Sequence, residues 1–388
     1  MRLIEVRDKA TAKKFLEVNV KINRNTPDYI QPLDKDIEQV FDPKKNKAFR
    51  HGKVIRWVLV DDKGESQGRI AAFTNKQYKN KGDQVMPGGM GFFDCINDQA
   101  AANLLLNQAK EWLANEGMTA MDGPINFGER DRWWGLVVKG FQPPLYCMNY
   151  NPPYYQQLLE TYGFKPFFEQ ICFGMNPKER MPEKIWSRNA LISEDPAFRV
   201  RTISKSELPK FAGDFATVYN AAWAGHGGLK QLKKEQVEVM FRQMKPVMDE
   251  RIIWFAYHRD QAVGIFVNLP DLNQWFKYLH GKFTLFHKLK FLWVKSTKPC
   301  TKFTGLVFGI VPQYQGMGVD AYLIGEAGKD VMQDSFPYTE YEMQWIGDFN
   351  PKMINVAQSL GDVYESRKLV TYRYQFDREM EYRRHPMV

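Results

Sequence analysis

Two glycines stand at a strand-to-helix transition in the second half of the chain, where they could bind a phosphate group. The apolar residues 306–311 predict a buried strand, and the apolar positions among residues 321–327 predict a helix. Between them lies QYQGMG, residues 313–318. The first amides of a helix lack partners and the helix dipole is positive there, so both favour an anion. Glycine lets a pyrophosphate approach the backbone closely, which a Cβ would block.

The motif is neither a Walker A loop, because no Gly-Lys-Ser/Thr follows, nor a GxGxxG dinucleotide loop. The string VPQYQGMGV, residues 311–319, set between a strand and a helix, resembles the acyl-CoA pyrophosphate loop of the GCN5-related N-acetyltransferases (GNAT). That family's pattern is Gln/Arg-x-x-Gly-x-Gly/Ala. Asn350, at the head of a helix after residues 338–346, resembles the asparagine that the family places near the pantetheine arm. The resemblance covers most of residues 200–376.

This resemblance implies a transferase that uses acetyl-CoA, or another acyl-CoA, as cosubstrate. The acceptor would be an amine on a small molecule or a peptide, and it would attack the thioester directly. The loop amides would hold the pyrophosphate, and the preceding strand would pair with the pantetheine amides and help to polarise the thioester carbonyl. The cofactor-binding residues implied in this way are Ile310, Val311, Gln315, Gly316, Met317, Gly318, Val319 and Asn350.

The general acid is not evident from the sequence. GNAT enzymes often have a tyrosine seven residues after the asparagine, but here that position is Ala357. Tyr364, Tyr372 or Tyr374 could replace it, and aromatic core packing is the alternative role for each. We take Tyr372 as the catalytic candidate.

The general base also has several candidates. Glu340 and Glu342 alternate onto one face of their strand, where a carboxylate could face an amine. Solvated strand carboxylates are the alternative interpretation. His226 lies in a glycine-rich segment that could border an acceptor pocket or be a plain loop.

The order of elements repeats along the chain. In both halves a strand pair precedes a further strand, an Asn-Pro dipeptide, a helix and a glycine; the last three occupy residues 151–163 and 350–361. Asn is a good N-cap, Pro fits the first helical position, and Gly supplies a left-handed C-cap. The recurrence indicates duplication. We therefore expect an α/β (α+β) protein of two GNAT-like domains, each a mixed, mostly antiparallel sheet flanked by helices. The boundaries would be 1–180, a linker at 181–196, and 197–388.

The first half lacks the phosphate loop. Residues 96–100, INDQA, occupy its place without a glycine pair, and Asp98 would repel a pyrophosphate. We expect the N-terminal domain to have lost CoA binding. Its run of Gly, Arg and Trp at residues 123–135 is either a substrate contact or a well-packed loop.

The composition limits the class of protein and its partners. The chain has 388 residues with 44% hydrophobic residues, which suits two folded domains, and a net charge of +9, which suits anionic partners or a basic soluble enzyme. Four scattered cysteines match neither a zinc cluster nor a disulfide framework, so we expect no metal. The N-terminus lacks a signal peptide's apolar region and no segment is long enough to span a membrane, which predicts a cytoplasmic protein.

Residues 275–302 alternate lysines with aromatic residues. Such a segment could lie on an anionic membrane as a peripheral contact or bind a nucleic-acid backbone. The alternative is an insertion that packs its aromatic residues on the domain and leaves its lysines in water. We expect no nucleic-acid partner.

Two rival functions remain at this point. Tandem GNAT-like folds also occur in the Fem-type aminoacyl transferases and the N-myristoyltransferases, so the donor could be an aminoacyl-tRNA, a lipid-linked group or a long-chain acyl-CoA. Alternatively, the chain could be a CoA-binding sensor or scaffold without turnover, as the missing tyrosine at Ala357 allows.

Overall fold

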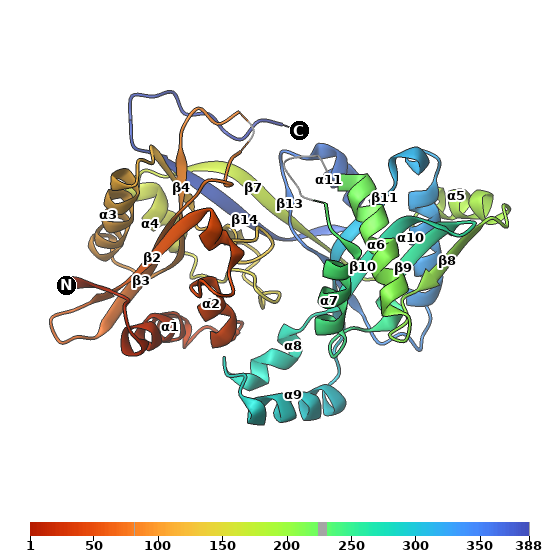
Figure 1. Ribbon diagram of the computed structural model, residues 1–388, viewed down its shortest axis with the longest axis horizontal. Coiled ribbons are helices and arrows are strands. Elements are labelled where there is room, and N and C mark those ends of the chain that lie inside the picture. Colours follow the sequence, from red (N-terminus) through yellow and green to blue (C-terminus); the bar gives the residue numbers. More distant parts are fainter. Residues whose placement is uncertain (81, 224–230, 388) are drawn as a thin grey trace.

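A fourteen-stranded sheet runs through the molecule and joins its two halves (Figure 1). The structure is a computed structural model that describes residues 1–80, 82–223 and 231–387. The first half contains β1 (Arg2–Glu5), α1 (Lys9–Asn23), α2 (Asp34–Val40), β2 (Gly52–Val60), β3 (Ser66–Asn75), β4 (Pro87–Cys95), α3 (Gln99–Asn115), β5 (Ala120–Gly123), β6 (Leu136–Lys139), α4 (Tyr155–Tyr162), β7 (Lys165–Met175) and α5 (Glu183–Ser193).

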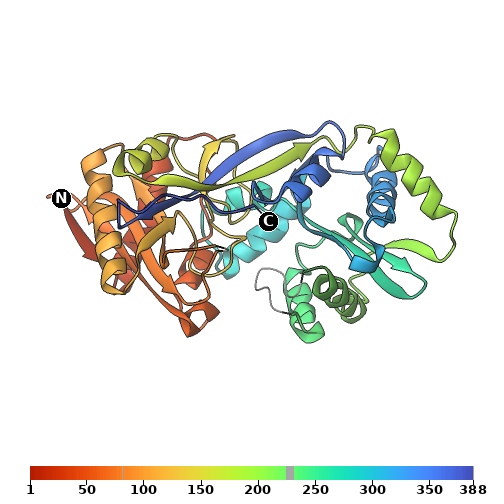
Figure 2. The ribbon, with the colours of Figure 1, turned by 90° about the horizontal axis from the view of Figure 1, so that it is seen from above.

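The second half repeats this order with an additional helical insertion between its third and fourth strands. It contains β8 (Phe198–Thr202), α6 (Leu208–Trp223), α7 (Lys234–Met244), β9 (Ile253–His258), β10 (Gln261–Pro270), α8 (Asn273–Phe276), α9 (Leu285–Thr297), β11 (Lys302–Ile310), α10 (Val319–Val331), β12 (Glu340–Met343), β13 (Ile346–Gly347), α11 (Pro351–Gln358) and β14 (Tyr364–Gln375). In Figure 2, α6 and α7 (green) lie below the sheet of this half, and α5 and α10 (yellow-green and blue) lie above it.

The sheet order is β1-β2-β3-β4-β5-β14-β7-β12-β11-β10-β9-β8, with β6 beside β14 and β13 beside β7. Among the strands of the described residues, only the β4–β5 and β11–β12 pairs are parallel, and both are short. The strand pairs expected in the two halves are β2–β3 and β9–β10, and both are antiparallel. The expected fold class, a mostly antiparallel sheet flanked by helices, is also confirmed.

Two long strands at the centre of the sheet exchange places. The last strand, β14, lies between β5 and β7, while β7 lies between β14 and the second half's β12. Tyr372 on β14 therefore packs in the core of the first half, whereas Phe173 on β7 packs in the core of the second. Residue 180, the expected domain boundary, thus lies between two halves that each complete the other's sheet.

Residues 181–196, expected to be a linker, contain helix α5. Its Asn189 is buried, and its side-chain amide donates to the backbone oxygen of Tyr322 at 3.2 Å and to Glu326 at 2.9 Å on α10. The charged, proline-containing sequence concealed this helix because only one narrow side of it is buried.

The two Asn-Pro dipeptides differ in role. Asn350 caps α11 as expected, since its side-chain oxygen accepts the amide of Met353 at 3.2 Å. Asn151 does not cap α4, which begins at Tyr155. Its side chain instead bonds both the amide and the carbonyl of Val137, at 2.8 and 3.1 Å, so it supports β6. A buried asparagine can satisfy a strand's backbone as readily as a helix's, and sequence does not distinguish the two uses.

None of the helices in the described part of the chain combines the length and the apolar composition that a transmembrane span requires.

Candidate active site

The glycine loop between β11 and α10 presents a series of free backbone amides. Gly316 and Gly318 have φ of +77° and +92°, a conformation that glycine adopts without strain. Within the described residues, the amides of Gly316, Met317 and Gly318 donate to no other group of the protein. Gly318 is the N-cap of α10, so the amides of the following first turn have no intrahelical acceptor. The loop therefore has the local geometry of an anion site.

Gln315 has a structural role in this loop. Its amide donates to the carbonyl of Pro312 at 3.2 Å, and its side-chain nitrogen donates to the carbonyl of Ile310 at 2.9 Å. These bonds close the turn at the end of β11. The amide of Gln315 is thus already engaged, and the free donors begin at Gly316.

The Cβ of an arginine from an unexpected part of the sequence lies beside the loop. A Cβ on Gly318 would be 3.9 Å from the Cβ of Arg188 on α5. The Arg188 residue is exposed, and it forms no ion pair with the described residues. A guanidinium here can reach a phosphate held by the loop amides. The sequence placed Arg188 in a linker, so nothing in the local pattern indicated this position.

The strand that leads to the loop separates from its parallel neighbour. Pairing between β11 and β12 runs from Lys302 with Glu340 to Gly305 with Met343, and the amide of Gln344 then donates to the carbonyl of Gly305. Beyond Gly305, β11 pairs only with β10. The opening between the two strands leaves one edge of residues 306–310 without a partner strand in the described chain.

An apolar cavity of about 520 Å³ fills this opening. It is lined by residues of α6, β10, β11, α10, β12 and α11 and by the segment after β12, which includes Trp345 and Phe349. Its lining contains no Asp, Glu, Lys, Arg or His among the described residues. On β11 the lining ends at Phe308, and on α10 it begins at Ile324, so the glycine loop that joins these two elements lies beyond the lining residues.

Tyr341 supplies a hydroxyl at the point where the strands separate. A Cβ on Gly305 would be 2.1 Å from the Tyr341 Oη, and this hydroxyl makes no hydrogen bond within the described part of the chain. Burial raises the pKa of Tyr341, which keeps it protonated as a hydrogen-bond donor. Tyr341 is not among the site residues predicted from the sequence. The signal was present in the alternation of β12, since Tyr341 lies between Glu340 and Glu342 and faces the other way.

The two glutamates of β12 take part in ion pairs. Buried Glu342 accepts from the Arg367 Nε at 2.6 Å and from the Ser366 hydroxyl at 2.8 Å, and it lies 3.3 Å from the Lys302 Nζ. Burial acts to raise the pKa of Glu342, but Arg367 and Lys302 outweigh it and lower the pKa. Exposed Glu340 lies 3.1 Å from the same Lys302. Neither glutamate is among the cavity-lining residues.

Tyr372 lies away from this site, because β14 crosses into the first half. Its hydroxyl donates to Glu160 on α4 at 2.8 Å, and its ring packs with the first half's core. Of the predicted cofactor-binding residues, Asn350 lines the cavity, whereas Ile310, Val311 and residues 315–319 are not part of its lining. Tyr372 lies at neither place. His226 lies outside the described residues.

Comparison with known proteins identifies the architecture. No family model matches the chain. A tandem GNAT protein from the clavulanic acid biosynthesis pathway superposes with a TM-score of 0.54 at 10% identity, over 98% of this chain and 99% of that one. A GCN5-related N-acetyltransferase from Sphaerobacter thermophilus gives a TM-score of 0.51 at 10% identity, over 98% of both chains. The chain has the tandem GNAT fold.

A curated relative extends over nearly the same length. The bacterial ceramide synthase of Caulobacter vibrioides is 25% identical over 369 residues, which is 94% of this chain and 95% of that protein. The expected resemblance is therefore confirmed at the level of fold, and this is a fold of acyltransferases.

In the described residues, the first half of the tandem GNAT fold lacks the open strand edge and the free loop amides of the second half. Its β4–β5 pairing runs from Pro87 to Gly89, and the opening beyond is filled by the chain itself, where the amide of Ile125 donates to Met90 at 2.7 Å. At the following helix, the Asp98 carboxylate accepts the amides of Ala100 and Ala101 at 2.7 and 3.1 Å. A carboxylate of the protein thus occupies the position where the second half presents free amides.

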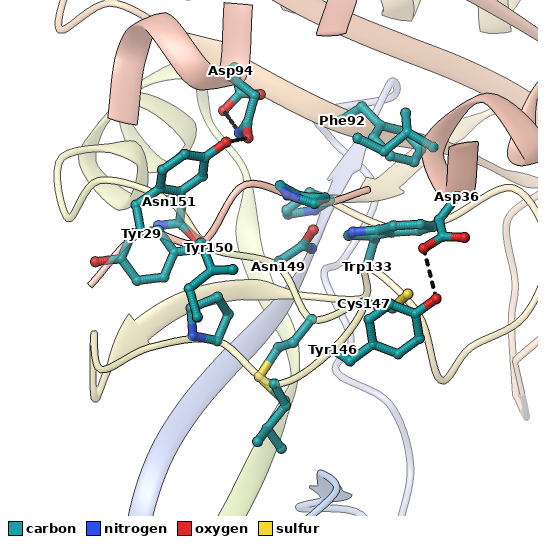
Figure 3. A pocket seen from close by; sticks show the side chains of 18 of the residues that line it. Tyr29, Asp36, Phe92, Asp94, Trp133, Tyr146, Cys147, Asn149, Tyr150 and Asn151 are labelled. Carbon is teal, nitrogen blue, oxygen red and sulfur yellow. Dashed lines mark hydrogen bonds between the residues drawn. The ribbon is translucent and has the colours of Figure 1, made fainter. Parts of the chain in front are cut away.

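A small polar pocket remains in the first half (Figure 3). It encloses about 50 Å³, enough for a few waters. At one end Asp94 is paired with Arg69 at 2.6 Å, and at the other the Tyr146 hydroxyl donates to Asp36 at 2.7 Å. Buried Trp133, from the run of Gly, Arg and Trp, also lines it. Within this run Ile125, Phe127, Trp133 and Trp134 pack in the N-terminal core, whereas Arg130 and Asp131 are exposed.

Proposed function

We propose that this protein is an acyl-CoA-dependent N-acyltransferase that transfers a long hydrocarbon acyl chain, rather than acetyl, to an amine. The observation that supports a long chain is the uncharged cavity of about 520 Å³ between β11 and α10, the two elements that the glycine loop joins. Cavities of about 300–1,000 Å³ hold whole organic ligands, and an acetyl group needs only a small part of that space. Apolar walls stabilise a hydrocarbon chain by removing it from water.

In this proposal, successive parts of the acyl-CoA bind to successive parts of the site. The free amides from Gly316 to Val319, with Arg188, would bind the pyrophosphate. The free edge of β11 would run along the pantetheine arm, and Asn350 would lie near it. The thioester would then sit near Gly305, with its acyl chain in the cavity. The hydroxyl of Tyr341 would donate to the thioester oxygen or to the departing thiolate.

The acceptor is proposed from the named relative. A ceramide is an amide of a fatty acid with a long-chain amino alcohol, so a ceramide synthase joins two apolar chains by acylating an amine. We propose a long-chain amino alcohol for this protein too, because the cavity lining is apolar on the β11, α10 and α11 sides alike. A polar donor such as an aminoacyl-tRNA would find no charged group in this lining.

A chain-length series tests the proposal. Purified protein is given acyl-CoA donors from acetyl to palmitoyl with a long-chain 2-amino-1,3-diol, and CoA release and amide product are measured. We expect kcat/KM to rise steeply with the length of the acyl chain. The matching diol without the amino group is the control, and it should give no product. Equal rates for acetyl and palmitoyl donors would count against the cavity as the acyl site, and no turnover with any donor would favour a CoA-binding scaffold.

A cavity-filling variant sharpens this test. Ile324 on α10 lines the cavity, so Ile324→Trp should lower kcat/KM for palmitoyl-CoA roughly tenfold or more while sparing shorter donors. Leu191→Trp adds the same ring at an exposed position of α5 and serves as the matched control.

A further inference from the structure

The insertion between β10 and β11 exposes an apolar helix face that the proposed reaction does not use. Five residues of α9 have large exposed fractions, from 55% for Leu292 to 75% for Leu285. We call this set the α9 stripe; its members are Leu285, Phe286, Leu289, Leu292 and Trp293. Figure 1 shows α9 at the lower edge of the molecule, away from the central sheet. Exposed apolar residues concentrated in this way mark a surface that contacts something else.

The α9 stripe occupies one side of the helix. At about 100° per residue, its members fall within an arc of roughly 120°. Phe291 and Val294, which are buried against the protein, fall on the opposite side. The stripe therefore points outward because the other face of the same helix is docked.

The insertion is held firmly enough to present this face in a fixed direction. The side-chain amide of Asn273 donates to the carbonyl of Pro144 at 2.7 Å, and Lys282 pairs with Asp34 at 2.6 Å. The ring of Phe276 packs edge-on against that of Tyr146 at 5.3 Å between centroids. These contacts join the insertion, which belongs to the second half, to the first half.

Lysines flank the α9 stripe on both sides. By the same helical spacing, Lys290 lies beside one edge and Lys288 beside the other, whereas half-buried Lys295 donates to the carbonyl of Pro246. Residues 272–302 contain seven lysines and no Asp or Glu. An outward apolar face bordered by lysines matches a helix that lies in the interface of an anionic bilayer, with its apolar side chains below the phosphates and its lysines among them.

We propose that the α9 stripe docks the protein on the surface of a membrane that contains anionic phospholipids. A second copy of the chain fits less well, since a symmetric contact through this face would place lysines against lysines. An acidic protein groove would need to match five large side chains and the lysines on both sides. An anionic bilayer provides both an apolar interior for the five side chains and phosphate groups for the lysines. This inference does not depend on the identity of the acyl donor.

Vesicle co-sedimentation of the full-length protein tests the proposal. The vesicles consist of phosphatidylcholine with or without phosphatidylglycerol. We expect the parent to bind the anionic vesicles and to be released in part by salt. The double variant Leu289→Glu, Trp293→Glu should bind at least tenfold more weakly. Its matched control is Val239→Glu, Met240→Glu, two exposed apolar residues on α7, which should bind as the parent does.

The lysines and the tryptophan give two further measurements. Replacing Lys288 and Lys290 with Gln should weaken binding to anionic vesicles about fivefold for each lysine and should not change binding to neutral ones. Phospholipids brominated along their acyl chains should quench tryptophan fluorescence in the parent and much less in Trp293→Phe. Circular dichroism and thermal unfolding confirm that each variant is folded.

Three outcomes would overturn the proposal. The first is unchanged vesicle binding by the folded Leu289→Glu, Trp293→Glu variant. The second is a parent that binds no vesicle but forms a dimer, by analytical ultracentrifugation, that this variant abolishes, which would make the stripe a contact between copies. The third is a monomeric parent that binds no vesicle, which would leave a protein partner as the occupant.

Discussion

The hydroxyl of Tyr341 lies directly against the α-carbon of Gly305, at the point where β11 and β12 separate. A single methyl group on Gly305 would meet the Tyr341 Oη at 2.1 Å. Because Gly305 on β11 has no side chain, the hydroxyl of Tyr341 on β12 can lie at the end of the cavity where the two strands separate. No charged group lines the cavity in the described part of the chain, so this hydroxyl is the proposed proton donor.

Tyr341→Phe should lower kcat about a hundredfold with little change in KM, because the hydroxyl would act on the thioester only as charge develops. Tyr338→Phe is the matched control, since Tyr338 donates to Asp249 at 2.8 Å outside the cavity lining. CoA release under saturating donor measures the effect. If both variants retain the parent rate, Tyr341 is a packing residue. Gly305→Ala should reproduce the loss by displacing the hydroxyl.

Met317→Glu should weaken acyl-CoA binding roughly tenfold, because it places a carboxylate beside free amides without altering either glycine. Met317→Gln is the isosteric control and should bind like the parent. Isothermal titration calorimetry with acetyl-CoA, and with a non-hydrolysable long-chain analogue, reports the affinities. Equal affinity of the two variants would remove the loop from the donor site.

Arg188→Glu should weaken binding of the same donors by a similar factor, and the loss should diminish as salt is raised. Lys184→Glu reverses a charge one helical turn earlier on α5 and controls for net charge. A free-energy coupling between Arg188 and Met317, measured by a double-mutant cycle, would show that both act on one phosphate group. Independent effects of the two substitutions would place Arg188 elsewhere in the mechanism.

Glu342→Gln should destabilise the fold by about 3–5 kcal/mol, because it leaves the Arg367 charge buried and without its partner. The pH dependence follows from the pKa of Glu342, which is lowered in the folded state from its ordinary 4.5. The stabilisation is present above the ordinary pKa and is lost as the pH falls through the folded value. Urea unfolding of the parent and variant against pH measures this. A variant of unchanged stability but reduced turnover would instead favour Glu342 as the catalytic base.

Residues 1–180 produced alone should not fold cooperatively. The fragment lacks β14, which pairs with β5, β6 and β7 and contributes Val370 and Tyr372 to its core. The same fragment joined by a flexible linker to residues 362–388 should regain a cooperative thermal transition. Circular dichroism distinguishes the two. A sharp transition in residues 1–180 alone would show that the strand exchange is dispensable.

Local sequence determined the features that depend on neighbours along the chain. The left-handed turns at Gly316 and Gly318, the start of α10, the cap of α11 at Asn350 and the two antiparallel hairpins all follow from residue type and spacing. Each rests on hydrogen bonds within a few residues or across a tight turn, so a single sequence contains the necessary information.

Features that depend on distant segments could not be found in this way. Tyr372 is in a strand with ordinary alternation, and only the exchange of β7 and β14 decides that it faces Glu160 in the first half. Likewise, the Cβ of Arg188 lies near Gly318 because α5 packs on α10 through Asn189.

The ion pairing of Glu342 and the cavity between β11 and β12 also depend on segments that are distant in the sequence. Glu342 had the pattern of a possible base, yet the register of β14 places Arg367 against it. The cavity, and the Tyr341 hydroxyl within it, exist because β11 and β12 separate after Gly305, and the space between two strands is a property of their pairing, not of either sequence. Local propensity therefore determined the turns and caps of this protein, whereas the pairing of strands remote in sequence decided which side chains surround the site.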